Sequence, residues 1–91
     1  YLMRLVTLGS IQTRLRDLLT EIVGQKNFSV DTPLFHAGLE LDSMSAAAFI
    51  VAIEQDFAIV LAEEDLELSS LYSLQTLSQF VAQQLDLKIH N

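Results

Sequence analysis

The residues with the most evident chemistry are the adjacent Asp42 and Ser43, which lie between a loop and a long apolar run. A serine hydroxyl acts either as a nucleophile or as the acceptor of a group that another protein attaches. The apolar run predicts a helix that begins at Ser43, because Asp and Ser both satisfy the free N–H groups of a helix start. Such a start also favours an attached phosphate. A helix cap alone also explains the pair, so further residues are needed to assign a function.

A hydrolase is the main enzymatic alternative, with Ser43 as nucleophile, His36 as base and Asp42 as the group that orients the histidine. Adjacent Asp42 and Ser43 point apart at a helix start, and the chain contains no Gly-x-Ser-x-Gly motif. We therefore expect no catalytic residue, and we interpret His36 as a partly exposed loop residue.

A metal site is not expected either. The chain has no cysteine, and the acidic residues at 63, 64, 65 and 67 lack the Asp-x-Asp-x-Asp-Gly spacing of calcium loops. These acids are interpreted as a solvated helix edge, with a partner-docking surface as the alternative.

Composition indicates one small globular domain. The chain has 91 residues, of which 51% are hydrophobic, with three glycines and one proline. Its net charge of −7 is uneven, because Lys88 is the only lysine or arginine after Lys26. An acidic surface disfavours nucleic acid and favours basic protein partners. No apolar stretch is long enough to span a membrane, and no secretory signal is evident, so we expect a cytoplasmic monomer.

Hydrophobic spacing predicts three main helices. The first follows an N-cap at Ser10 and ends at Gly24, the second spans about residues 43–57, and the last follows a cap at Ser73. The residues assigned to the core are Ile11, Leu15, Leu18, Leu19, Ile22, Leu34, Phe35, Leu39, Phe49, Ile50, Ile53, Phe57, Tyr72, Leu74, Leu77, Phe80, Val81 and Leu85.

A long loop, residues 25–42, separates the first two helices, and Asp31-Thr32-Pro33 is predicted to start a helical turn within it. A short third helix is expected to open at Ser69 or Ser70. The predicted fold is therefore all-α: a small four-helix bundle of three main helices plus the short one. The predicted boundaries are an N-terminal extension or linker (1–9), the domain (10–87) and a frayed tail (88–91).

Two segments carry a resemblance to a known family. The first is Phe35-His36-Ala37-Gly38-Leu39-Glu40-Leu41-Asp42-Ser43-Met44, and the second is the helix end Ala52-Ile53-Glu54-Gln55-Asp56-Phe57. Together they resemble the acyl carrier protein family, in which an Asp-Ser-Leu motif follows a loop glycine and precedes a helix with an acidic, phenylalanine-containing end. The resemblance extends from about Ile11 to Leu85.

The resemblance implies a 4′-phosphopantetheine arm, transferred from coenzyme A to Ser43 by a phosphopantetheinyl transferase. The thiol of the arm then holds an acyl group as a thioester, so the chain is a phosphoprotein and a carrier, not an enzyme. Asp42 is assigned to recognition of the transferase or its metal ion. The further partners are an acyl- or aminoacyl-loading enzyme and synthase or condensing enzymes. Two alternatives remain open: a peptidyl carrier of nonribosomal peptide synthesis, and a helical interaction module without a prosthetic group.

The chain departs from the family at its second helix. Met44 replaces the usual leucine, and Ser45 and Ala48 stand where fatty-acid carriers typically have acidic residues, which remain only at Glu54 and Asp56. We therefore expect partners to bind through apolar contact more than through charge. The departure favours a polyketide or other secondary-metabolite pathway over fatty-acid biosynthesis. The expected docking residues are Leu41, Met44, Ala48, Val51, Ala52 and Glu54.

Overall fold

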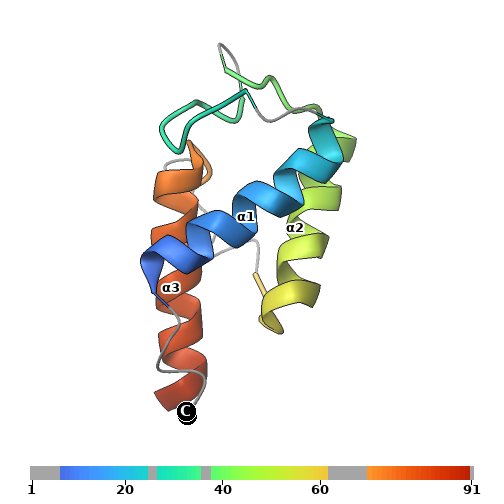
Figure 1. Ribbon diagram of the computed structural model, residues 1–91. Helices are drawn as coiled ribbons and strands as arrows, with labels where there is room; N and C mark the ends of the chain where they lie inside the picture. The colour runs from blue at the N-terminus through green and yellow to red at the C-terminus, as the bar shows by residue number, and fades with distance from the viewer. Residues whose placement is uncertain (1–6, 25–26, 36–37, 62–69, 91) are drawn as a thin grey trace.

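The computed structural model describes residues 7–24, 27–35, 38–61 and 70–90, with the backbone alone for 87–90. Within these residues the fold is all-helical, as predicted, and contains no strand. The helices are α1 (Leu8–Val23), α2 (Ser43–Phe57) and α3 (Leu74–His90). Helix α1 packs against both other helices and crosses in front of them in Figure 1. The starts of α2 and α3 lie at the same end of the bundle, under the connection that precedes α2 (Figure 1).

The core consists of apolar side chains from all three helices and from the connections between them. Most of the residues that helical spacing assigned to it are buried or packed against it. Tyr72 is an exception, because 57% of its surface is exposed, and its assignment to the core was wrong. The fully packed cluster is Ile11, Leu15, Leu18, Leu19, Phe28, Leu34, Phe49, Ile53, Ile59, Leu61, Leu74, Leu77 and Val81.

The first helix begins earlier than predicted. Its N-cap is Thr7, whose side chain accepts a hydrogen bond from the Ser10 backbone N–H at 3.1 Å. The Ser10 hydroxyl in turn accepts the Thr7 N–H at 3.0 Å, which completes a capping box. The predicted cap at Ser10 was therefore wrong by three positions, since Ser10 closes the box from inside the helix. The end at Gly24 is confirmed, with a φ of 74° in the left-handed region.

The other two helices begin at the predicted caps. Helix α2 spans the predicted range, with Asp42 as its N-cap. Ser73 accepts a hydrogen bond from the Thr76 N–H and opens α3. The backbone of α3 continues to His90, beyond the predicted boundary at residue 87. No helix in the described part of the chain is long and apolar enough to cross a membrane.

The connection between α1 and α2 is held by hydrogen bonds to α1 and to the turn before α3. The Leu34 N–H donates to the Tyr72 carbonyl at 2.8 Å, which fastens the connection to the turn before α3. From α1, the Arg16 guanidinium donates to the Phe28 carbonyl and stacks over the Phe28 ring. The described part of the turn predicted to start at Asp31 is not helical, because the chain closes a turn from the Thr32 N–H back to the Ser29 carbonyl, before the proline. Residues 36–37, where the rest of this prediction falls, lie outside the described part of the chain.

The short third helix is not present in the described residues. Residues 70–72 form a turn, and residues 62–69, where the rest of this prediction falls, lie outside the described part of the chain.

Candidate functional site

Ser43 is the first residue of α2 and is exposed. Its position depends on how the preceding connection folds back on itself. The Leu39 N–H donates to the Pro33 carbonyl at 2.9 Å, and the Leu41 N–H donates to the Leu34 carbonyl at 2.9 Å. Because Leu34 is buried, these bonds attach the approach to Ser43 to the core.

Gly38, in the connection before α2, lies where the backbone leaves no room for a side chain. A Cβ atom added to Gly38 would lie 1.8 Å from the carbonyl oxygen of Pro33, far inside van der Waals contact. The backbone at Pro33 therefore approaches Gly38 more closely than any side chain permits. Gly38 was identified from the sequence as part of a motif, and the close approach explains why a residue with no side chain stands there.

Asp42 is engaged with the helix backbone. Its Oδ1 accepts a hydrogen bond from the Ser45 N–H at 2.7 Å. Hydrogen bonds from Ser45, and to a lesser extent from the Met44 backbone, lower the pKa of Asp42 below its usual value, so it is ionised at neutral pH. This carboxylate thus caps α2, which is not the geometry of a carboxylate that orients a catalytic histidine. His36, the third member of that hypothetical triad, lies outside the described residues.

The start of α2 offers a suitable environment for a phosphate on the Ser43 hydroxyl. The first turn of the helix contains no acidic residue, and the carboxylate of the preceding Asp42 is the cap of the helix. The partial positive charge of a helix N-terminus stabilises an attached anion. The site therefore combines an accessible hydroxyl with the partial positive charge of a helix N-terminus.

One face of α2 is exposed and uncharged. We define the outer face of α2 as Met44, Ala47, Ala48, Val51 and Gln55, which lie on one side of the helix and are all exposed. Met44 is 84% exposed and Val51 48%, both unusual for large apolar side chains. This face begins directly beside Ser43. Ala47 was not singled out from the sequence, although its spacing from Met44 and Val51 places it here.

The other three residues expected at a docking surface do not belong to the outer face of α2. Leu41 and Ala52 are half-buried and pack against the core. The Glu54 carboxylate accepts the Leu61 N–H at 2.8 Å, so it holds the segment that follows α2. That segment presents Val60, which is 78% exposed, between the buried Ile59 and Leu61. Sequence reasoning missed Val60, although the alternation of three apolar residues after the helix could have indicated that one faces outward.

A bidentate ion pair joins α1 to α2. The Arg14 guanidinium binds both carboxylate oxygens of Asp56, with Nε 2.8 Å from Oδ2. The hydrogen bond from Arg14 lowers the pKa of Asp56, and the pKa of Arg14 is raised in return. The sequence placed Asp56 in the acidic end of α2, and the structure shows that this end is fastened to α1.

The described residues contain no group of three histidine, aspartate or glutamate side chains that could hold a metal ion. The acids at 63, 64, 65 and 67 lie outside the described residues.

Comparison with known protein families decides the class of this site. The model of the phosphopantetheine attachment site family matches residues 13–83, which include the connection, all of α2 and the start of α3. The chain belongs to this family. Such a protein carries 4′-phosphopantetheine covalently, is modified by a phosphopantetheinyl transferase and catalyses no reaction itself. Searches of curated proteins and of solved structures found no match.

Proposed function

We propose that Ser43 is the residue of this carrier to which 4′-phosphopantetheine is attached. The observation that carries the proposal is the exposed Ser43 hydroxyl at the first position of a capped helix, within the segment matched by the family model. The phosphate of the arm would be stabilised by the helix N-terminus, and Ser43 Oγ would form the ester bond. The group supplies a terminal thiol for thioester chemistry, which the chain, having no cysteine, does not offer.

Asp42 has two roles in this proposal. Within the chain it caps α2 through Ser45 and fixes the backbone on which Ser43 stands. Its second Oδ atom is available to a basic group or metal ion of the transferase, because the side chain is exposed. This second role rests on the chemistry of the carboxylate and its position next to the acceptor hydroxyl.

The cargo is proposed to be an acyl group of a polyketide or other secondary-metabolite pathway. The supporting observation is the outer face of α2, which has no charged side chain along the whole helix. Carriers that dock through charge would present acidic residues there. A peptidyl carrier remains the alternative, and loading assays with aminoacyl- and acyl-transferring enzymes would separate the two.

The outer face of α2 is proposed as the surface that partner enzymes bind, by apolar contact at Met44, Ala48 and Val51. Partner affinity measured across a salt series tests this, because binding through exposed charges weakens steeply with added salt. We expect a shallow salt dependence and a clear loss of affinity in Val51→Asp. A steep salt dependence, or unchanged affinity in Val51→Asp, would contradict apolar docking. Asp31→Asn, an exposed position outside α2, is the control for a change of surface charge.

The carrier function itself is tested by incubating the wild-type chain with coenzyme A and a permissive phosphopantetheinyl transferase. We expect the intact mass to increase by one phosphopantetheine group. If the intact mass does not increase with any of several transferases, the proposal is wrong, and a helical interaction module without a prosthetic group becomes the better interpretation. If the unmodified chain hydrolyses esters and Ser43→Ala does not, the hydrolase hypothesis would be supported instead.

A further inference from the structure

Met44 is a large apolar side chain that the fold leaves in solvent directly after Ser43. It is the second residue of α2, and with 84% of its surface exposed it is the most exposed large hydrophobic residue in the described part of the chain. It belongs neither to the buried core nor to the residues packed against the core. A solute therefore reaches this side chain without any unfolding, and a chemical change there leaves the packing of the helices intact.

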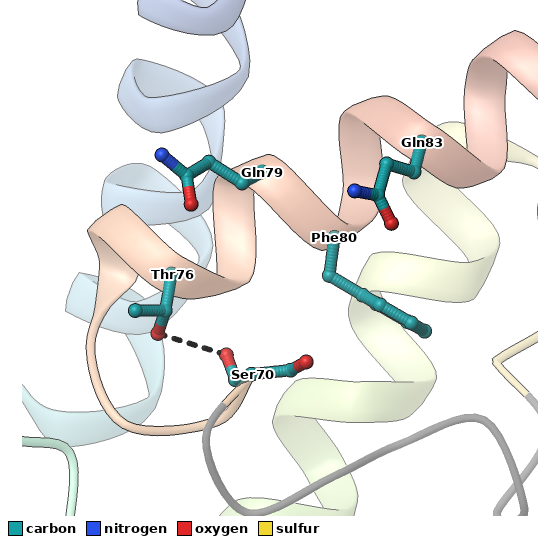
Figure 2. Close-up of a pocket in the computed structure, with 5 residues that line it drawn as sticks. All are labelled: Ser70, Thr76, Gln79, Phe80 and Gln83. Carbon is teal, nitrogen blue, oxygen red and sulfur yellow. Dashed lines mark hydrogen bonds between the residues drawn. The ribbon is translucent and has the colours of Figure 1, made fainter.

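The thioether of Met44 holds the only sulfur atom in the described part of the chain. The sequence has no cysteine, and Met3, the other methionine, lies outside the described residues. The small hollow beside the start of α3 offers only hydroxyl, amide and phenyl groups (Figure 2). A thioether differs from these groups in that a peroxide converts it to a sulfoxide under mild conditions. Among the described residues, such oxidation is therefore directed to the start of α2.

The position of Met44 connects its chemistry with that of Ser43. Side chains of a helix lean toward its N-terminus, so the thioether lies over the start of α2, where Ser43 stands. The backbone of Met44 has a different function, because its N–H contributes to the hydrogen bonding of the Asp42 cap. Oxidation of the sulfur leaves this backbone contact in place. It changes the surface beside Ser43 and preserves the cap of the helix.

We propose that Met44 is a site of reversible oxidation by hydrogen peroxide, and that its sulfoxide weakens the docking of the phosphopantetheinyl transferase on α2. The sulfur lone pair attacks one peroxide oxygen, so an S–O bond forms while the O–O bond breaks. The proton of the transferred oxygen passes to the departing hydroxide, which leaves as water. Sulfur loses two electrons and the peroxide gains them. Methionine sulfoxide reductases reverse the step: two thiols become a disulfide, and the oxygen leaves as water.

The sulfoxide weakens docking because it makes an apolar contact polar. The outer face of α2 has no charged side chain, so the docking proposed for it depends on apolar area, to which Met44 contributes. A sulfoxide oxygen buried against an apolar surface loses its hydrogen bonds to water. Losing the contribution of one buried methionine side chain weakens binding by about tenfold or more. The inference rests on the proposed docking role of this face and adds its regulation.

The first part of the test measures the oxidation itself. Wild type, Met3→Leu and Met44→Leu are treated with hydrogen peroxide, and peptide mass mapping shows which methionine gains an oxygen atom. Met3→Leu retains only Met44, and Met44→Leu retains only Met3, so the two variants are matched controls. We expect Met44 to be oxidised as fast as N-acetylmethionine, with no change in melting temperature. Much slower oxidation, or a fall in melting temperature, would overturn the proposal.

The second part measures attachment of the arm, with the apparent KM of the transferase for the chain as the readout. Untreated wild type is tested first: if the arm does not attach to it, the proposed function fails, and this inference fails with it. After peroxide treatment we expect KM to rise about tenfold in wild type and Met3→Leu. It should stay constant in Met44→Leu and recover after treatment with sulfoxide reductases for both epimers. An unchanged KM in oxidised wild type, or an equal rise in Met44→Leu, would overturn the proposal.

Discussion

The Oδ1 atom of Asp42 lies 2.7 Å from the backbone nitrogen of Ser45, so the acidic residue next to the proposed acceptor serine is also the cap of the helix that bears it. In our proposal this one carboxylate combines two functions, capping of α2 and recognition by the transferase. The hydrogen bond to the helix needs only an acceptor oxygen, whereas recruitment of a basic group or metal ion needs the charge.

The two functions of Asp42 can be separated by substitution. Asn is as good an N-cap as Asp, so Asp42→Asn should keep the melting temperature close to the wild-type value while slowing attachment of the arm. Asp42→Ala removes the cap as well, and both the melting temperature and the attachment rate should fall. Thermal unfolding and the time course of the mass increase measure the two effects. An attachment rate in Asp42→Asn equal to that of the wild type would show that the charge has no part in recognition.

The ion pair between Arg14 and Asp56 predicts a pH-dependent stability. Because the hydrogen bond from Arg14 lowers the pKa of Asp56 in the folded chain, the unfolded chain binds the proton more readily. The contribution of the pair is therefore complete above the unfolded pKa, near 3.8, and is lost as the pH falls through the lower folded value. We expect Asp56→Asn to melt below the wild type at neutral pH, and this difference to shrink on acidification.

Melting temperatures recorded between about pH 7 and pH 3 check this expectation. Asp31→Asn is the control, because Asp31 is exposed and forms no ion pair in the described part of the chain. A difference between Asp56→Asn and the wild type that stays constant as the pH falls would show that the pair does not stabilise the fold.

The close approach of Gly38 to Pro33 predicts a steric cost for any side chain at that position. Gly38→Ala should destabilise the fold by about 1–3 kcal/mol, the usual cost of forcing extra atoms into a packed site. It should also slow attachment of the arm, because the displaced backbone leads to Ser43. Gly9→Ala is the matched control: its Cβ would have only one neighbour, at 3.8 Å, and α1 would gain up to about 1 kcal/mol from the better helix former. Denaturant unfolding of both variants is the measurement, and equal effects would contradict the steric account.

The sequence predicted the structure best where residues close together in the chain mark the start or end of a helix. Helical spacing and the Asp42 cap predicted α2 from Ser43 to Phe57, and the left-handed end of α1 followed from Gly24. The error at the start of α1 has a local cause, since Thr7 and Ser10 both suit a cap and only their reciprocal bonds show which residue is outside the helix.

Contacts between distant residues had no such signal. Glu54 was expected at the docking surface, but its partner is a backbone N–H seven residues later, which no side-chain pattern reveals. Tyr72 was assigned to the core as an aromatic residue near a helix start. The structure uses its backbone carbonyl to hold Leu34 and leaves its ring in solvent. Ser43 itself was singled out from its neighbours in the chain, whereas the close approach of Gly38 to Pro33 became visible only in the folded connection.

The most direct test of the account is to identify which serine receives the arm. Wild type, Ser43→Ala and Ser45→Ala are incubated with coenzyme A and a phosphopantetheinyl transferase, and the intact mass of each is measured. Ser45 is the matched control, since it lies in the same helical turn and keeps its backbone N–H when its hydroxyl is removed. The account predicts one phosphopantetheine group on the wild type and on Ser45→Ala, and none on Ser43→Ala. A mass increase that persists in Ser43→Ala would contradict it.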